Sequence, residues 1–268
     1  MKIVVFDLDE TLGYFTEYGI FWDSLTHYLK NKEKAPLTQN DFDEILDLYP
    51  EFLRPNIINI LTYLKEKKQS NCCDKMMIYT NNTGPREWCQ HIIKYFEKKL
   101  NYKLIDQLIA AFKVNGKTME ICRTTHTKTH KDLIKCTKIP ATTEICFLDD
   151  TFYPEMTNDN IYYINVKPYY HDLKMDYMIQ KFKESAVGEK ILDATDMDSD
   201  FEEKMMDHIK LYEYKYMNKD SNEYEIDKIL SKQIISHLHY FFNKARNPKT
   251  QKNKPKRSVK RKTYRKYH

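Results

Sequence analysis

The sequence predicts an α/β fold built on a parallel β-sheet, and three segments support this prediction. Each is a short apolar run without the alternation of a half-exposed strand: residues 3–6, 76–79 and 144–148. Stretches of helical periodicity separate the runs, as expected of strand–helix–strand units. Each run also ends in polar, reactive side chains. Because open sheets of this kind carry their chemistry at the carboxyl ends of the strands, we expect these side chains to meet.

The composition is that of one full domain with an addition, or of two small domains. The chain has 268 residues, of which 41% are hydrophobic and 13% aromatic, enough for a buried core. The mean hydropathy is −0.73 and the N-terminal apolar run is short, so we expect neither a membrane span nor a secretion signal. The six cysteines form no C-x-x-C pair, and we expect reduced thiols. These features favour a cytosolic or nuclear protein.

The charge is distributed unevenly along the chain. Residues 243–268 contain 12 of the 44 Lys and Arg and no Asp or Glu, which leaves 32 basic against 39 acidic residues elsewhere. This tail has no apolar period, and we expect it to be disordered. Its basic clusters at 254–257 and 260–262 are typical of a nuclear localisation signal or of electrostatic binding to RNA or DNA. A tail that only aids solubility is an equal alternative.

Two segments lie between the first and second apolar runs. Residues 13–49 are aromatic and polar, with a helix expected only around 21–29, and they either line the site or form an elaborated crossover. A clear helix then opens at Leu53, with Pro55 at its first position. The apolar stripe of this helix contains Ile57, Ile58, Leu61 and Leu64.

The rest of the first 185 residues continues the alternation of helices and strands. We expect helices over 85–100, 131–135 and 173–182, strands within 108–114 and over 161–166, and a polar loop over 117–130. The loop contains Cys122, His126 and His130, whose C-x3-H-x3-H spacing could hold a metal on one helical face, although a fourth ligand is missing.

The last part of the chain has a different character. Residues 184–200 are acidic and predict a linker. Apolar residues then recur at helical spacing over 201–216 and again over 226–241, which predicts two amphipathic helices that could form a hairpin and dock on the body. We therefore divide the chain into an α/β domain (1–185), a helical extension (186–242) and the basic tail (243–268).

The three strand ends supply the carboxylates that phosphoryl transfer needs. Asp7 and Asp9 follow the first apolar run, and Asp149 and Asp150 follow the third. Asp7, ionised at pH 7, could attack phosphorus, while Asp9 could protonate the leaving oxygen and then activate water. The four carboxylates offer the oxygen ligands that Mg²⁺ prefers, with Asp7 and Asp149 first among them.

Phosphate binding requires donors and a cation near these acids. Thr80 follows the second apolar run, and Lys131 lies on the helix that leads into the third. Their hydroxyl and ammonium groups would bind phosphate oxygens and stabilise charge in the transition state. Thr11 and Asn81, which adjoin the same motifs, complete the candidate phosphate-binding set. A single acidic pair could be a turn or a helix cap, but three strand ends and a lysine in this order favour a site.

The order Asp7-Leu-Asp-Glu-Thr11, Thr80, Lys131 and Asp149-Asp150 resembles the four motifs of the haloacid dehalogenase superfamily of phosphatases. The closer likeness is to the NLI-interacting-factor-like group, which includes phosphatases of the RNA polymerase II C-terminal domain. That group is marked by Asp-Leu-Asp-Glu-Thr-Leu, Leu-Arg-Pro and Lys-Asp-Leu, found here at 7–12, 53–55 and 131–133.

This resemblance covers residues 1–185 and implies a Rossmann-like three-layer sandwich with a mostly parallel sheet. It also implies Mg²⁺ dependence, a phosphoenzyme on Asp7 and a phosphoserine or phosphothreonine protein as substrate. The sequence departs from the group at Asn81 and Asn82, where a small residue usually follows the threonine, and at Asp150, where Asn is common. The stretch after Thr80 also lacks a clear three-stranded insert.

Two other functions fit the same residues. The basic tail could guide the enzyme to the phosphorylated end of a nucleic acid, or the fold could serve as a non-catalytic binding module. Frequent Lys and Tyr and scarce Gly indicate an AT-rich genome, such as that of a protist or of a large DNA virus acting in its host cell. The sequence leaves the oligomeric state open.

Overall fold

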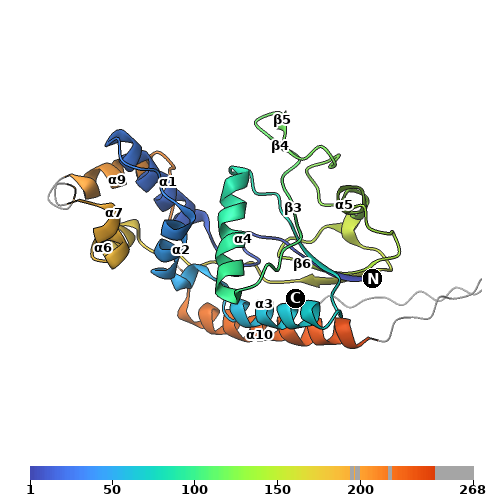
Figure 1. The fold of residues 1–268 in the computed structure, drawn as a ribbon. Helices are drawn as coiled ribbons and strands as arrows, with labels where there is room; N and C mark the ends of the chain where they lie inside the picture. Colours follow the sequence, from blue (N-terminus) through green and yellow to red (C-terminus); the bar gives the residue numbers. More distant parts are fainter. Residues whose placement is uncertain (194–195, 197–199, 217–218, 245–268) are drawn as a thin grey trace, which may run out of the picture.

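A five-stranded parallel sheet forms the centre of the protein (Figure 1). The structure is a computed structural model that describes residues 1–193, 196, 200–216 and 219–244. The strands lie in the order β3-β2-β1-β6-β7, and all four pairings are parallel, which confirms the predicted α/β class. The strands are β1 (Lys2–Phe6), β2 (Lys75–Tyr79), β3 (Gln107–Ile109), β6 (Glu144–Asp149) and β7 (Ile161–Asn165).

The central strand β1 is buried on both faces, as its unbroken apolar run predicts. Val4 and Phe6 face one layer of the core, and Ile3 and Val5 face the other. Phe6 pairs with Ile78 of β2 and with Leu148 of β6, so the three strands end level with one another. This register brings the polar residues that follow each strand to one edge of the sheet.

Helices cover both faces of the sheet and complete the three layers. On the Val4 and Phe6 face lie α3 (Ile57–Gln69), α4 (Arg86–Leu100) and α10 (Ser221–Asn243). On the other face lies α5 (His130–Thr137), which buries Leu133. The described helices include none that is both long and apolar enough to cross a membrane.

A second group of helices forms a lobe beside the sheet, on the left of Figure 1. This helical lobe contains α1 (Thr16–Asn31), α2 (Gln39–Asp47), α6 (Met175–Lys183), α7 (Ala186–Ile191) and α9 (Phe201–Lys210). Helix α1 packs against α6 and α9, and α2 packs against α7. Helices from both ends of the chain therefore build the lobe together. Two 3-10 turns, η1 (Pro50–Phe52) and η2 (Pro154–Met156), lie in the connections.

The prediction of a C-terminal hairpin is wrong. Helix α9 packs on α1 and α6, whereas α10 packs on α3 and β7, so the two helices dock on different parts of the molecule. The predicted linker is also partly wrong, because it contains α7, whose first turn is capped by the Ser185 hydroxyl. Residues 245–268 of the basic tail lie outside the described residues.

Several boundaries differ from those predicted. Helix α1 spans Thr16–Asn31 and is longer than the predicted 21–29. The prediction was too short because the helix buries polar residues, Glu17 and Ser24, which interrupt the apolar pattern. Helix α3 begins at Ile57 and excludes Pro55, since Asn56 has a left-handed backbone with φ of 65°. The strand expected within 108–114 divides into the end of β3 and a small hairpin of β4 (Lys113–Val114) and β5 (Lys117–Thr118).

Candidate active site

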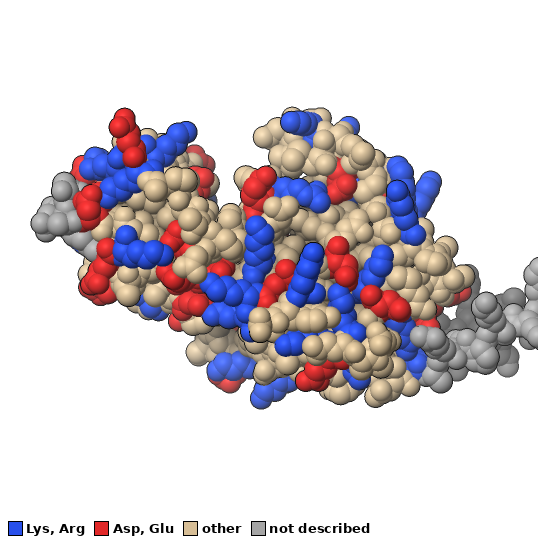
Figure 2. Space-filling model, in the orientation of Figure 1, with Lys and Arg blue, Asp and Glu red and all other residues tan. Residues whose placement is uncertain are grey.

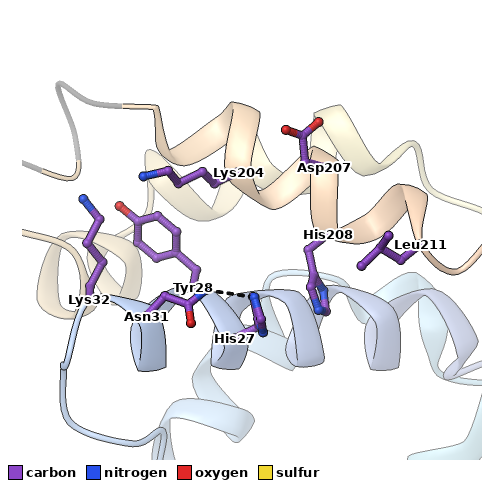
Figure 3. A pocket seen from close by; sticks show the side chains of 8 residues that line it. All are labelled: His27, Tyr28, Asn31, Lys32, Lys204, Asp207, His208 and Leu211. Atoms are coloured by element: carbon purple, nitrogen blue, oxygen red, sulfur yellow. Dashed lines mark hydrogen bonds between the residues drawn. The ribbon is translucent and has the colours of Figure 1, made fainter.

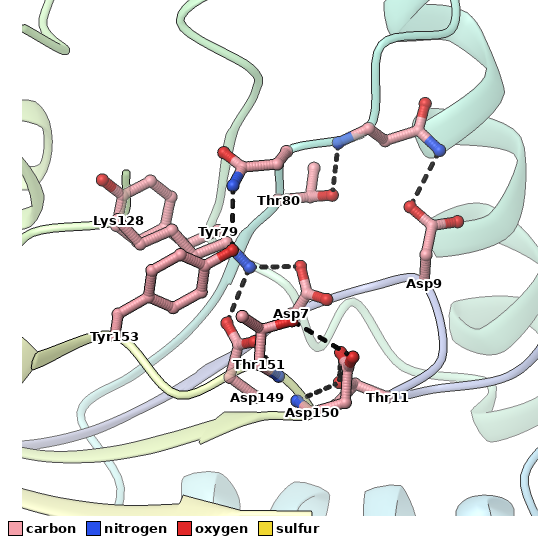
Figure 4. Close-up of polar contacts among 12 residues, drawn as sticks. Asp7, Asp9, Thr11, Tyr79, Thr80, Lys128, Asp149, Asp150, Thr151 and Tyr153 are labelled. Carbon is pink, nitrogen blue, oxygen red and sulfur yellow. Dashed lines mark hydrogen bonds and ion pairs between the residues drawn. The ribbon is translucent and has the colours of Figure 1, made fainter. Parts of the chain in front are cut away.

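Polar side chains from three strands meet at the carboxyl edge of the sheet (Figure 4). Asp7 follows β1, Thr80 follows β2, and Asp149 ends β6. The backbone of Asp7 continues the sheet, because its N–H donates to the carbonyl of Leu148 at 2.8 Å. Asp7, Thr80 and Asp149 are all buried, with exposed fractions of 7%, 1% and 0%. The sequence therefore predicted correctly that these strand ends meet.

Three carboxylates form one cluster. Asp7, Asp149 and Asp150 each offer a carboxylate oxygen, and these oxygens lie within 4.8 Å of one another. Hard oxygen donors of this kind suit Mg²⁺. Among the described residues one ammonium group contacts the cluster directly, so its single positive charge cannot balance three carboxylates in their ionised form, whereas an added divalent cation would. The residues present therefore fit the predicted metal.

The ammonium group in contact with this cluster belongs to Lys128. Its Nζ donates to Asp7 Oδ1 at 2.5 Å and to Asp149 Oδ2 at 2.7 Å, and Figure 4 shows it between the two carboxylates. Burial alone would lower the pKa of Lys128, but Asp7 and Asp149 raise it above its ordinary value. The rings of Tyr79 and Tyr153 lie 5.9 and 5.4 Å from this ammonium group and add cation–π contacts.

The prediction that Lys131 supplies the cation is wrong. Lys131 is exposed on the first turn of α5, whereas Lys128 lies in the loop before the helix. The helix turns Asp132 inward, where its carboxylate accepts hydrogen bonds from the backbone N–H and the hydroxyl of Thr124. Lys131 adjoins this buried residue in the sequence and faces solvent. Because Thr129 is the N-cap of α5, Lys128 is the last residue of the loop before the helix.

Asp9 does not join the acidic cluster, contrary to its predicted role as a metal ligand. Figure 4 shows it turned away from Asp149 and Asp150, and its Oδ2 accepts a hydrogen bond from Asn82 Nδ2 at 2.8 Å. Burial, with a further contribution from the charge of Asp7, raises the pKa of Asp9 to about 7. Near neutral pH this carboxyl can therefore both give and take a proton.

The predicted phosphate-binding residues differ in what they contact. The Thr80 hydroxyl accepts from the backbone N–H of Asn82 at 2.9 Å, so its proton remains available to another oxygen. The Thr11 hydroxyl donates to Asp150 Oδ1 at 3.1 Å and therefore positions a carboxylate. The Asn81 side chain spans Arg123 and Tyr153 through its oxygen and nitrogen. Phosphate binding by Thr11, Thr80 and Asn81 stays a prediction.

A buried arginine holds the turn that carries Asp9. Arg54, 1% exposed, donates from Nε to the carbonyl of Thr11 at 2.6 Å and from Nη2 to the carbonyl of Glu10 at 2.5 Å. Glu10 has a left-handed backbone with φ of 58°, which is unfavourable for a residue with a side chain. Burial lowers the pKa of Arg54 to about 10, so it remains charged at neutral pH. Arg54 thus stabilises an otherwise strained turn.

A second buried arginine and a disulfide hold the loop that carries Lys128. Arg123 Nη1 donates to the carbonyls of Thr80 and Ala110 at 3.1 and 2.9 Å, which ties the loop to the end of β2. Cys122 and Cys136 form a disulfide that brackets the loop and most of α5. The expectation of reduced thiols is therefore wrong for these two cysteines.

The predicted Cys122, His126 and His130 metal site is also wrong. The Cys122 sulfur is bonded to Cys136 and cannot serve as a thiolate ligand. Within the described part of the chain, the Asp7, Asp149 and Asp150 cluster is the one group of three or more such side chains with its ligand atoms close enough to share an ion.

Helix α1 lines several cavities, two of which also contact α4 or α9. The larger of these two, of about 650 Å³, is lined by Asp9 and by residues of α1 and of the start of α4. The other, of about 380 Å³, lies between α1 and α9, and Figure 3 shows His27 and His208 next to each other among the residues that line it. Their ring centroids are 4.2 Å apart, so this stacked pair helps to attach α9 to α1.

Comparisons with known proteins do not extend these observations. Neither the protein-family models nor the curated proteins contain a match to this chain.

Proposed function

We propose that this protein is a Mg²⁺-dependent phosphomonoester hydrolase that forms an aspartyl-phosphate on Asp7. The observation that carries the proposal is the contact of Lys128 with Asp7 and Asp149 in a buried acidic cluster at the carboxyl edge of a parallel sheet. A nucleophilic carboxylate needs neighbouring positive charge, because it repels the phosphate that it attacks. Lys128 supplies part of that charge. The order of the motifs along the sequence supports the same reaction.

The metal would be held by the carboxylates of Asp7, Asp149 and Asp150. When bound, Mg²⁺ supplies positive charge that neutralises the phosphoryl oxygens in the transition state. Thr11 holds Asp150 in place through its hydroxyl, and the backbone N–H of Thr151 donates to Asp149 Oδ1 at 2.9 Å. These contacts orient two of the three acids before any substrate arrives.

The reaction divides into two displacements at phosphorus. In the first, an oxygen of Asp7 forms a bond to phosphorus, the bond to the leaving oxygen breaks, and Asp9 gives that oxygen its proton. In the second, a water oxygen attacks phosphorus while Asp9 accepts the water's proton, and the bond to Asp7 breaks to release phosphate. Asn82, which donates to Asp9, would orient this carboxyl in both steps.

We propose a phosphoserine or phosphothreonine protein as the substrate. The alternative is a phosphorylated nucleic-acid end, and the 12 Lys and Arg of residues 243–268 favour it, because basic tails bind nucleic acid through its phosphates. In the third alternative, the protein is a binding module that has this fold and hydrolyses no phosphate ester. One set of measurements separates the three.

The test is hydrolysis of p-nitrophenyl phosphate by the full chain with and without Mg²⁺. We expect turnover that requires Mg²⁺, and we expect Asp7→Asn to lower it by at least about a thousandfold, because the nucleophile is removed. Asp159→Asn, the same change at an exposed aspartate before β7, should leave turnover unchanged. An acid-quenched reaction should carry the mass of one phosphoryl group on wild type and not on Asp7→Asn.

Retained activity in Asp7→Asn would refute the proposed nucleophile. No turnover of p-nitrophenyl phosphate, phosphopeptides or phosphorylated oligonucleotides by the wild type would instead favour the binding module. Faster turnover of 3′- or 5′-phosphorylated oligonucleotides than of phosphopeptides would favour the nucleic-acid alternative.

A further inference from the structure

The cavity lined by Asp9 and by residues of α1 and α4 is an open groove with aromatic side chains in its wall. Trp22 of α1 and Trp88 of α4 line it, together with Tyr212 and Tyr214 from the segment after α9. Figure 2 shows the surface hollowed between the helical lobe and the body around α4. Tyr212 is 44% exposed and both tryptophans are only partly buried, so ring surface remains accessible to a ligand.

The charged groups of the groove are acidic. Asp9, Asp23 and Glu87 line it, and among the described residues no Lys or Arg does. The Asp23 side chain is 58% exposed, and Glu87 is exposed without an ion-pair partner in the described part of the chain. His91 adds no charge at neutral pH, because burial lowers its pKa below the ordinary value. The groove thus offers negative charge and aromatic faces together.

The arrangement is built into the fold. A Cβ atom on Gly19 would lie 3.3 Å from Cζ2 of Trp88, so the absence of a side chain on α1 lets this ring lie close against the helix. The Tyr212 hydroxyl donates to Asp23, and the Tyr214 hydroxyl donates to Glu17. These bonds fix the C-terminal segment as one wall of the groove.

We propose that this groove binds an arginine or lysine side chain next to the phosphorylated residue of a protein substrate. Aromatic faces attract cations through their quadrupole, and nearby carboxylates add to this attraction. Asp9, the proposed proton donor, is one of the residues that line the groove, so a substrate whose phosphate lies at Asp7 would have neighbouring residues within reach of the groove. The proposal rests on the proposed phosphatase function and narrows its substrate class.

A nucleic-acid strand fits the same groove poorly. The rings could stack on bases, but the phosphates that follow each base would meet Asp23 and Glu87 without a Lys or Arg among the described lining residues. Charge complementarity therefore favours a cationic peptide over a polyanion.

Binding can be measured without turnover, because Trp22 and Trp88 are the only two tryptophans of the chain and both line the groove. The Asp7→Asn protein is titrated with three phosphoserine peptides that carry Arg, Ala or Glu at the flanking positions, and tryptophan fluorescence is recorded. We expect saturable quenching, with the Arg peptide bound about tenfold more tightly than the Ala peptide and the Glu peptide bound most weakly. Equal affinities for the three peptides would refute the proposal.

Glu87→Lys tests the charge of the groove with little risk to folding, since the side chain is exposed. We expect it to raise KM for the Arg phosphopeptide about tenfold and to leave turnover of p-nitrophenyl phosphate unchanged. Glu66→Lys, an equal charge reversal on an exposed face of α3, is the control and should change neither.

The outcomes separate this proposal from the phosphatase function. Normal turnover of p-nitrophenyl phosphate without any preference among the peptides would refute the groove proposal alone. Tighter binding of a phosphorylated oligonucleotide than of the Arg peptide would also refute it. If no substrate is hydrolysed, the phosphatase function fails, while the fluorescence titration still reports which peptide the groove prefers.

Discussion

The molecule buries two clusters of acidic side chains and stabilises them in different ways. At the edge of the sheet, Asp7 and Asp149 share the Lys128 ammonium. In the helical lobe, Glu17 and Asp172 are 0% and 5% exposed, and both lie within hydrogen-bond distance of the Tyr214 hydroxyl, which can donate to one of them at a time. No described Lys, Arg or His forms an ion pair with either of them.

The different partners have consequences for charge. Burial raises the pKa of Glu17 to about 8, so this carboxyl holds a proton near neutral pH. Burial also raises the pKa of Asp149, and it reaches only about 7 because the Lys128 charge opposes that rise. A fixed cation beside a buried acidic cluster thus favours the ionised carboxylates that a metal requires. A cluster without one takes up a proton and serves packing.

Removing the cation from the first cluster should have the largest effect. In Lys128→Met, Asp7 and Asp149 lose their shared partner, and the transition state loses a positive charge. We expect turnover of p-nitrophenyl phosphate to fall by about 10²- to 10³-fold, with a loss of about 3 kcal/mol in the free energy of unfolding. Steady-state kinetics and urea titration without added metal measure the two effects.

Lys131→Met is the matched control, because Lys131 is exposed on the same segment. It should preserve both turnover and stability. If the Lys131 variant loses activity and the Lys128 variant does not, the assignment of the catalytic lysine is wrong.

Opening the disulfide should loosen the segment that delivers the cation. Cys122 and Cys136 are 14 residues apart, and Lys128 lies between them. Replacing both by Ala should lower the free energy of unfolding by about 2–3 kcal/mol, because the unfolded chain gains freedom. Turnover should fall less than in Lys128→Met, since Arg123 still ties the loop to Thr80 and Ala110.

Thermal unfolding measures the loss of stability in the double variant, and steady-state kinetics measure the loss of turnover. Cys72→Ala, a change at an exposed free cysteine, is the control. An unchanged melting temperature in the double variant would argue against a stabilising disulfide.

The sheet and its acidic edge could be predicted from sequence because their signals are local. Four apolar residues before Asp7 define a buried strand, and parallel strands of similar length end at the same edge. Lys128 could not be found in this way, because its position depends on where α5 begins and on how Arg123 and the disulfide hold the loop. Sequence spacing alone favoured Lys131, which faces solvent.

The helical lobe was harder to predict because contacts distant in sequence determine it. Helix α1 buries Glu17, whose hydrogen-bond donors Leu173 and Tyr214 lie more than 150 residues away. Such buried polar residues interrupt the apolar pattern from which a helix is recognised. The amphipathic patterns correctly predicted that two helices exist here, but α9 ends at Lys210 rather than near 216, and α10 begins at Ser221 rather than near 226. Their docking sites depend on surfaces that no local pattern describes.

The second cluster offers a smaller test, in which a carboxyl is replaced by a group that is always neutral. The pKa of Glu17 is raised from an ordinary value of 4.5 to about 8, so folding takes up a proton between these values. Its stabilising contribution is therefore complete below pH 4.5 and is lost as the pH rises through 8. In Glu17→Gln this loss should disappear. From pH 5 to pH 8.5, the free energy of unfolding of the variant should therefore rise by about 1–2 kcal/mol relative to that of the wild type, after allowance for solvent screening. Urea titrations at both pH values, followed by tryptophan fluorescence, measure the difference. A gain of the same size at both pH values would mean that Glu17 is ionised throughout, and the contrast between a cation-bound and a proton-bound acidic cluster would then fail.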